Sequence, residues 1–172
     1  MNYISLIGDT GLIACVEYKV GILPSRINSH FQGNPHQLDP EIRQKISSEI
    51  AEILGLIQTP SDLDSFEISS SFPYFFPYLP VFVNGFLYEE CQFVSKDRKH
   101  IVSYFSASHN YQNPRKKGER YKETGTFVPW KVNISYQRFF LIPPKNTYFQ
   151  VDSRVSFSDQ ARPRRVRPGL NN

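Results

Sequence analysis

Short stretches in which apolar and polar residues alternate are the feature that most limits the fold of this chain. Ala14, Val16, Tyr18 and Val20 alternate with Cys15 and with charged residues, and the segment 148–157 alternates in the same way. A period of two places successive side chains on opposite faces of a β-strand, with one face buried. Glycine and proline separate these stretches and are typical of turns. The sequence therefore predicts mostly antiparallel β structure.

Two hairpins are predicted. The segments 3–7 and 12–20 flank the turn Gly8-Asp9-Thr10-Gly11, and the segments 81–83 and 86–94 flank Asn84-Gly85, a dipeptide that favours a type I′ turn. The segments 100–107, 127–141 and 148–157 bring the prediction to about eight strands. We expect a sandwich or split barrel.

One amphipathic helix is predicted near residues 40–54. Asp39 occupies the N-cap position, Pro40 the first helical position, and Gly55 follows the last turn, a pattern typical of helix ends. One apolar stripe at helical spacing contains Ile42, Ile46, Ile50, Ile53, Leu54 and Ile57. We expect this stripe to pack on the sheet, which makes the fold class α+β.

The chain of 172 residues has the size of one domain. We expect a globular domain over 1–157, with a long basic loop at 108–126, and an extended basic arm over 158–172. Residues 1–153 hold 15 basic and 15 acidic side chains, so the net charge of +4 comes from the segment after Asp152 and Ser153. Because a partner responds to local potential, these extensions are the expected contact sites.

The neutral body is divided in charge. Residues 39–97 carry a net charge of −7 and residues 98–153 a net charge of +7. If the two segments lie on different faces, copies of the chain can join head to tail. If they form neighbouring strands, the charges cancel instead.

The basic loop and the arm are the predicted contacts with protein subunits or with nucleic acid. Cationic side chains hold phosphates while a tyrosine stacks on a base, and the same residues suit an acidic protein surface. The alternatives are a solvated hairpin tip and a solubilising tail. The candidate residues are Arg115, Lys116, Lys117, Arg120, Tyr121, Lys122, Arg162, Arg164, Arg165 and Arg167.

An aromatic segment with three prolines, residues 72–80, is a second candidate interface. Its prolines exclude a central strand, while its rings require burial against something. Either it covers one end of the core or it contacts a partner. The candidate residues are Phe72, Tyr74, Phe75, Phe76 and Tyr78.

The search for catalytic and metal-binding motifs is mostly negative. The four histidines lack spacings such as His-Glu-x-x-His, and Cys15 and Cys91 lie far apart in the sequence. We therefore expect no metal, no cofactor and no enzyme activity. Both cysteines fall in predicted strands, which favours two buried free thiols; a reactive Cys91 is the minor alternative.

These observations favour a non-catalytic structural subunit of a larger assembly, whose partners are other protein subunits or copies of itself. At the level of fold alone, the predicted architecture resembles tail, neck or tube subunits of phages and injection machines. The alternative is a nucleic-acid-binding accessory subunit of a ribonucleoprotein complex. The sequence shows no signal peptide and no membrane span, so the expected location is the cytoplasm or a virion-like particle.

Overall fold

The computed structural model describes residues 3–112, 128–141 and 147–156. The N-terminal part forms a three-stranded antiparallel sheet in the order β1-β2-β3. Its strands are β1 (Ile4–Leu6), β2 (Ile13–Cys15) and β3 (Val20–Ile22). The turn over residues 8–11 joins β1 to β2, which confirms the first predicted hairpin turn. The prediction of one strand over 12–20 is wrong, because β2 ends at Cys15, the chain turns over 16–19, and β3 begins at Val20.

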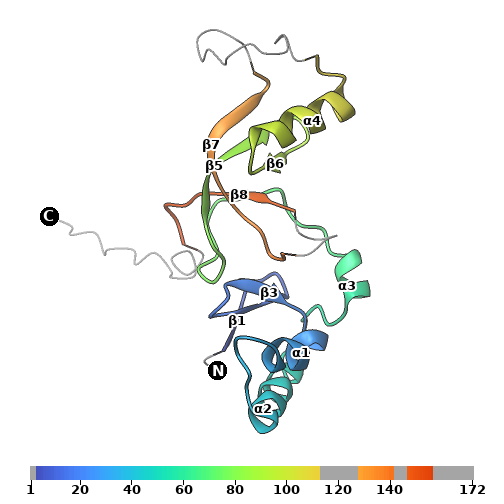
Figure 1. The fold of residues 1–172 in the computed structure, drawn as a ribbon, viewed down its shortest axis with the longest axis vertical. Coiled ribbons are helices and arrows are strands. Elements are labelled where there is room, and N and C mark those ends of the chain that lie inside the picture. The colour runs from blue at the N-terminus through green and yellow to red at the C-terminus, as the bar shows by residue number, and fades with distance from the viewer. Residues whose placement is uncertain (1–2, 113–127, 142–146, 157–172) are drawn as a thin grey trace, which may run out of the picture.

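The second sheet has five strands in the order β4-β8-β7-β5-β6. All neighbours are antiparallel except β4 and β8, which run parallel. These strands are β4 (Ser71–Phe72), β5 (Phe82–Tyr88), β6 (Phe93–Ser95), β7 (Trp130–Gln137) and β8 (Phe149–Val151). Figure 1 shows the two sheets in different parts of the molecule, with β8 between the β1–β3 region and the α4 end.

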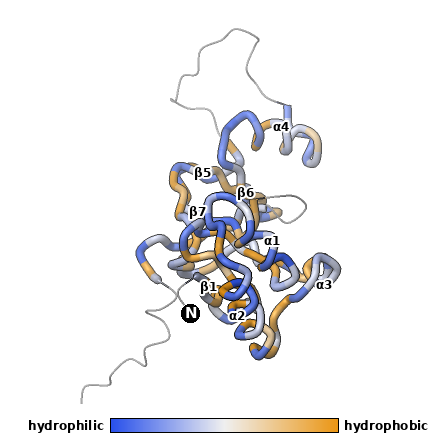
Figure 2. The backbone as a smooth tube through the Cα atoms, turned by 60° about the horizontal axis from the view of Figure 1, so that its bottom comes forward, coloured by the Kyte–Doolittle hydropathy of each residue, from blue (hydrophilic) through white to orange (hydrophobic). Residues whose placement is uncertain are grey.

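The described residues contain four α-helices and one short 3-10 helix, so the prediction of a single helix is wrong. They are η1 (Pro24–Arg26), α1 (Ile27–Gln32), α2 (Pro40–Ala51), α3 (Pro60–Asp64) and α4 (Arg98–His109). Within the described ranges, none of these helices has the length and apolar character needed to cross a bilayer. Figure 2 shows that hydrophobic stretches along the described chain are short and interrupted by hydrophilic residues.

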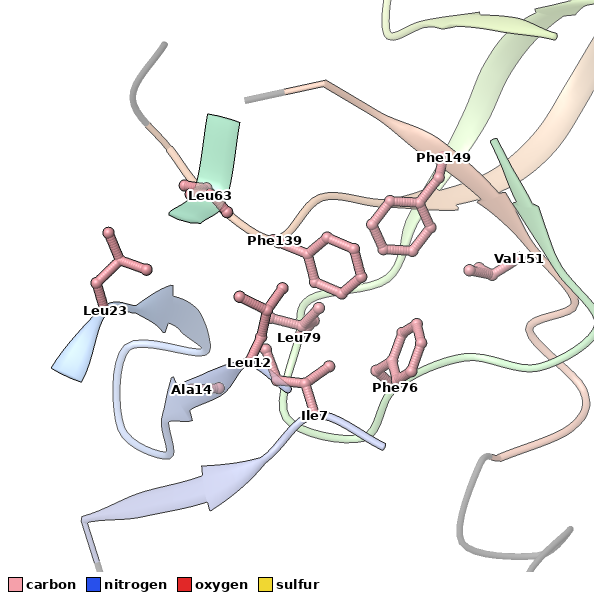
Figure 3. Close-up of a cluster of buried hydrophobic side chains, with 10 residues drawn as sticks. All are labelled: Ile7, Leu12, Ala14, Leu23, Leu63, Phe76, Leu79, Phe139, Phe149 and Val151. Atoms are coloured by element: carbon pink, nitrogen blue, oxygen red, sulfur yellow. The ribbon is translucent and has the colours of Figure 1, made fainter. Parts of the chain in front are cut away.

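One core cluster joins the two sheets (Figure 3). Ile7, Leu12 and Ala14 come from the first sheet and its turn, and they meet Phe139 and Phe149 from the second sheet region. The backbone N–H of Gly21 also donates to the carbonyl of Phe139 at 2.6 Å. The sheets therefore share buried apolar surface, the main source of stability in a domain of this size.

The prediction of an α+β fold rich in antiparallel strands is confirmed at this level. The strands of the described residues do not close into a barrel. A sandwich or split barrel stays a prediction. The charge-divided segments meet in the second sheet, where Leu87 of β5 pairs with Lys131 of β7 and Lys131 forms an ion pair with Glu89. At this place opposite charges lie on neighbouring strands and cancel.

The predicted helix near 40–54 is α2, which begins at Pro40 and ends at Ala51, before Gly55. Asp39 stands at the N-cap, but its side chain makes no capping hydrogen bond. Only part of the predicted apolar stripe is buried. Ile46 and Ile50 lie in the core, whereas Ile42 is 36% exposed and Leu54 is 95% exposed. Leu54 lies beyond the last helical turn, where helical spacing no longer aligns side chains with the core.

Two predicted strand features are wrong. The segment 100–107 is helical and belongs to α4, whose N-cap Asp97 accepts a hydrogen bond from the His100 N–H at 2.8 Å. Asn84-Gly85 is not a hairpin turn, because β5 continues through it with an irregular register against β7. The hairpin between β5 and β6 turns over residues 89–92 instead.

Candidate metal centre

A cysteine and two histidines converge at the turn of the β2–β3 hairpin. Cys15 is the last residue of β2 and pairs with Val20 of β3. The turn between them is held by the N–H of Lys19, which donates to the Cys15 carbonyl at 2.8 Å. The Tyr18 N–H points to the Cys15 Sγ at 3.4 Å. The hairpin therefore fixes the direction of the thiol.

The two histidines come from α1 and from the segment that follows it. His30 lies in the last turn of α1, and His36 lies four residues beyond the end of that helix at Gln32. Ile27 and Phe31 bury the apolar side of α1 against Ile46 and Ile50 of α2. This packing holds both imidazoles over the hairpin.

The donor atoms of these three residues lie close enough to share one ion. One ligand atom each from Cys15, His30 and His36 lies within 4.8 Å of the others. Cys15 Sγ and His36 Nε2 are 3.4 Å apart. Tetrahedral Zn²⁺ with bonds of roughly 2.0–2.3 Å separates its donors by roughly 3.3–3.8 Å. One pair already has this separation, and the longest needs to close by about 1 Å.

Glu17 determines which nitrogen of His36 faces the thiol. The His36 Nδ1 lies 3.0 Å from Glu17 Oε2, and the His36 side chain is only 1% exposed. Because a carboxylate only accepts, this pairing favours a hydrogen on Nδ1 and leaves Nε2 as the nitrogen that faces Cys15. A carboxylate behind a ligating histidine is the usual outer partner in zinc sites.

His30 supplies a donor without another partner. Its Nε2 is buried and makes no hydrogen bond within the described residues. Burial, with a smaller contribution from His36, lowers the pKa of His30, and the neutral ring is the form that binds metal. A buried polar atom without a partner costs about 1–3 kcal/mol. A bound cation would satisfy this atom.

Cys15 is fully buried, which confirms one of the two predicted buried thiols. Burial is the largest cause that raises the pKa of Cys15, while backbone hydrogen bonds from Tyr18 and Glu17 oppose it. The metal-free cysteine is therefore a thiol, and a metal that binds there must displace its proton.

Tyr18 covers the donors from the solvent side. Its ring stands edge-on to His36 at 4.7 Å and to His30 at 5.8 Å between centroids, and the residue is 40% exposed. One sulfur and two imidazole nitrogens suit Zn²⁺ or another soft or borderline ion, whereas Mg²⁺ and Ca²⁺ require oxygen. The buried donors are a feature of structural metal sites, whereas three protein ligands are the number found in catalytic zinc sites.

The donors differ from the residues predicted from sequence to bind partners. The candidates of the basic loop and of the arm over 158–172 fall outside the described residues. These are Arg115, Lys116, Lys117, Arg120, Tyr121, Lys122, Arg162, Arg164, Arg165 and Arg167.

The aromatic segment mostly packs inward. Phe76 is buried, and Phe72, Tyr74 and Phe75 are partly buried against the core that joins the two sheets. Tyr78 is 40% exposed. The segment thus covers the core, and an interface there stays a prediction. Cys91 is exposed, so the prediction that it is buried is wrong.

The candidate metal centre was not predicted from sequence, because it has neither paired cysteines nor the His-Glu-x-x-His spacing. The three donors stand in the pattern Cys15-x2-Tyr18-x11-His30-x5-His36. This spacing is close to Cys-x2–4-Cys-x12-His-x3–5-His, with a tyrosine at the second cysteine. A search that tolerated one lost ligand would have found it.

Comparison with protein families, with curated proteins and with solved structures finds no match to this chain.

Proposed function

We propose that this chain is a non-catalytic, metal-binding interaction module, in which Cys15, His30 and His36 hold one Zn²⁺ ion. The observation that carries this proposal is the convergence of one donor atom from each of the three residues within 4.8 Å. His30 also has a buried Nε2 that lacks a hydrogen bond within the described residues. The ion would link the β2–β3 hairpin to α1. Metal binding would stabilise the fold of this small unit, as burial of a larger apolar core stabilises a larger domain.

The burial of the donors supports a structural role for the ion. Catalytic zinc keeps a position open to substrate. Here Cys15 is fully buried, the His36 side chain is 1% exposed, and the Tyr18 ring covers both imidazoles. The Cys-His-His set would hold the ion, and these surroundings leave little room for a substrate.

Protein subunits are the proposed partners. Val83 of β5 and Val132 of β7 are 61% and 51% exposed, and these strands are neighbours in the second sheet. Exposed apolar side chains on a sheet suit a protein contact. Membership of a larger assembly therefore stays our first expectation, and nucleic-acid binding through the basic loop and arm stays the alternative.

Titration of the full chain with Co²⁺ tests the metal site, because tetrahedral Co²⁺ bound to a thiolate absorbs visible and near-ultraviolet light. We expect one Co²⁺ per chain, displaced by Zn²⁺. Cys15→Ser should abolish both the thiolate band and the tight binding, and His30→Asn should abolish the tight binding. Cys91→Ser, which removes the exposed cysteine, is the matched control and should bind as the wild type does. Binding that survives Cys15→Ser, or absence of binding in a folded wild-type chain, would overturn the proposal.

A further inference from the structure

The hairpin and helix that carry the metal centre recur in the second half of the chain. β2 and β3 lead into α1, and β5 and β6 lead into α4 (Figure 1). Both hairpins have the same register, with Cys15 paired to Val20 and Tyr88 paired to Phe93. In each unit a further antiparallel strand, β1 or β7, pairs with the first hairpin strand.

The two turns have the same length and the same left-handed position. Each turn has four residues, and the fourth has a positive φ angle: 53° at Lys19 and 59° at Gln92. Positive φ is uncommon outside glycine. Its occurrence at the same position of two hairpins with the same register indicates the same turn.

The two helices share a sequence motif and a buried face. α1 contains Ile-Asn-Ser-His-Phe over 27–31, and α4 contains Ile-Val-Ser-Tyr-Phe over 101–105. The isoleucine and the phenylalanine of each motif are buried. His30 and Tyr104 therefore occupy the same place on the two helices.

Four side chains of the second unit correspond in sequence position to Cys15, Tyr18, His30 and His36 of the first unit. The pattern Tyr88-x2-Cys91-x12-Tyr104-x4-His109 has the spacing of a Cys2His2 zinc unit. These residues also meet in space. Cys91 Sγ lies 3.3 Å from the Tyr104 hydroxyl, and the His109 ring lies 4.7 Å from that of Tyr88 and 5.7 Å from that of Tyr104.

Ring packing takes the place of an ion in this unit. Tyr104 stacks on Phe93 with centroids 3.7 Å apart, and Tyr88 meets Phe105 edge-on at 4.3 Å. The Tyr88 hydroxyl donates to Glu90. His109 Nε2 is nevertheless buried without a hydrogen bond inside the described ranges, as His30 Nε2 is.

We propose that Tyr88, Cys91, Tyr104 and His109 form the second, metal-free copy of the ββα unit, which retains a latent site for Zn²⁺ or Co²⁺. The two tyrosines replace ligands, while Cys91 and His109 are two ligands that remain. The protein is thus a tandem of one metal-bound unit and one aromatic unit. The metal-bound state of the first unit rests on the proposed function, whereas the latent site in the second unit does not.

Restoration of the two ligands tests the latent site. We expect the double variant Tyr88→Cys/Tyr104→His to bind one more tetrahedral Co²⁺ per chain than its parent. The matched control, Tyr88→Ser/Tyr104→Asn, removes the same rings without adding a sulfur or an imidazole and should gain none. Both variants are made also in the Cys15→Ser background, where the expected gain is from no ion to one. This background separates the latent site from the first metal centre.

A single substitution tests the latent site with less risk of unfolding the chain. Tyr104→His alone gives the second unit one thiolate and two imidazoles, the donor set of the first unit, and should bind one further Co²⁺ more weakly. If either ligand-adding variant is unfolded without metal, Zn²⁺ should restore its circular dichroism spectrum. No additional ion in a folded variant, no rescue of an unfolded one, or an equal gain in the control would overturn the proposal.

Discussion

Glu17 Oε2 lies 3.0 Å from His36 Nδ1 and pairs with it across the turn that joins β2 to β3. The carboxylate is 65% exposed while the imidazole is 1% exposed. An exposed acid therefore orients a buried ring, and it directs Nε2 toward Cys15 at 3.4 Å.

Removal of this acid should weaken metal binding without abolishing it. We expect Glu17→Ala to lower the affinity for Zn²⁺ by roughly 10–100-fold, as is typical for the loss of an outer partner of a ligating histidine. The stoichiometry should stay at one, measured by competition with a chelator. Glu90→Ala changes the acid at the same turn position of the β5–β6 hairpin and should leave the affinity unchanged. Equal effects of the two variants would contradict this role of Glu17.

Tyr18 stands at the second-cysteine position of the Cys2His2 spacing, so its replacement by cysteine should tighten the proposed site. A structural zinc site binds with about 10–16 kcal/mol, which is roughly 2.5–4 kcal/mol for each of four ligands. We therefore expect Tyr18→Cys to raise the affinity by about 100-fold or more. Tyr18→Phe keeps the covering ring and should bind as the wild type does. A strong loss of affinity in Tyr18→Phe would indicate that the phenol itself is a ligand.

Local signals predicted local structure well. Pro40 and the isoleucines after it predicted α2, and the glycines at 8 and 11 predicted the first hairpin, because caps and turns depend on neighbouring residues. The segment 100–107 was predicted as a strand because it is rich in residues with β preference. Its buried pair, Ile101 and Phe105, has helical spacing, and tertiary packing decides such ambiguous stretches.

The metal centre depends on contacts that sequence spacing only suggests. Cys15 is brought to His30 and His36 by the hairpin register and by the packing of α1 on α2. One of the four usual ligands is a tyrosine, so a strict motif search fails. The repeat was missed for the same reason, because the two units retain different ligands.

Gly85 shows why Asn84-Gly85 is part of a strand and not a turn. A Cβ atom at this position would lie 2.5 Å from Tyr136 Cδ1 and 2.8 Å from Tyr136 Cε1. Glycine is therefore required by the close approach of β7. We expect Gly85→Ala to cost about 1–3 kcal/mol of unfolding free energy through overpacking, measured by urea denaturation. Gly33→Ala, where the nearest atom would be 3.6 Å away, should cost much less.

Asp62 gives α3 a dependence on pH. Its carboxylate accepts hydrogen bonds from the Thr59 hydroxyl at 2.8 Å and from the Thr59 N–H at 2.9 Å, and these bonds lower the pKa of Asp62. Because the folded-state pKa of Asp62 lies below its unfolded value of about 3.9, the ionised carboxylate stabilises the fold at pH values above about 3.9. This contribution should disappear as the pH falls through the folded-state pKa.

Asp62→Asn should therefore lower stability at pH 6 and lose its effect at pH values below the folded-state pKa. Denaturation curves of both chains across this range measure the difference, with Asp9→Asn in the β1–β2 turn as the control for charge. A difference between wild type and Asp62→Asn that stays constant down to the lowest pH would contradict the assignment.

Gln137 is a buried polar residue that fixes the aromatic segment to β7. Its side chain accepts from the Phe76 N–H at 2.8 Å and donates to the carbonyls of Phe76 and Leu79 at 2.9 and 2.8 Å. Gln137→Leu would remove these bonds from the Phe76 N–H and the Leu79 carbonyl, at about 1–3 kcal/mol each, while the Phe76 carbonyl still accepts from the Leu79 N–H at 3.1 Å. We expect a loss of about 3 kcal/mol or more in urea denaturation, against little change for Gln44→Leu on the exposed side of α2. Because Phe76 and Leu79 belong to the core that joins the two sheets, the variant should loosen both sheets together. A loss below about 1 kcal/mol would mean that water replaces Gln137 and that this network does not hold the segment.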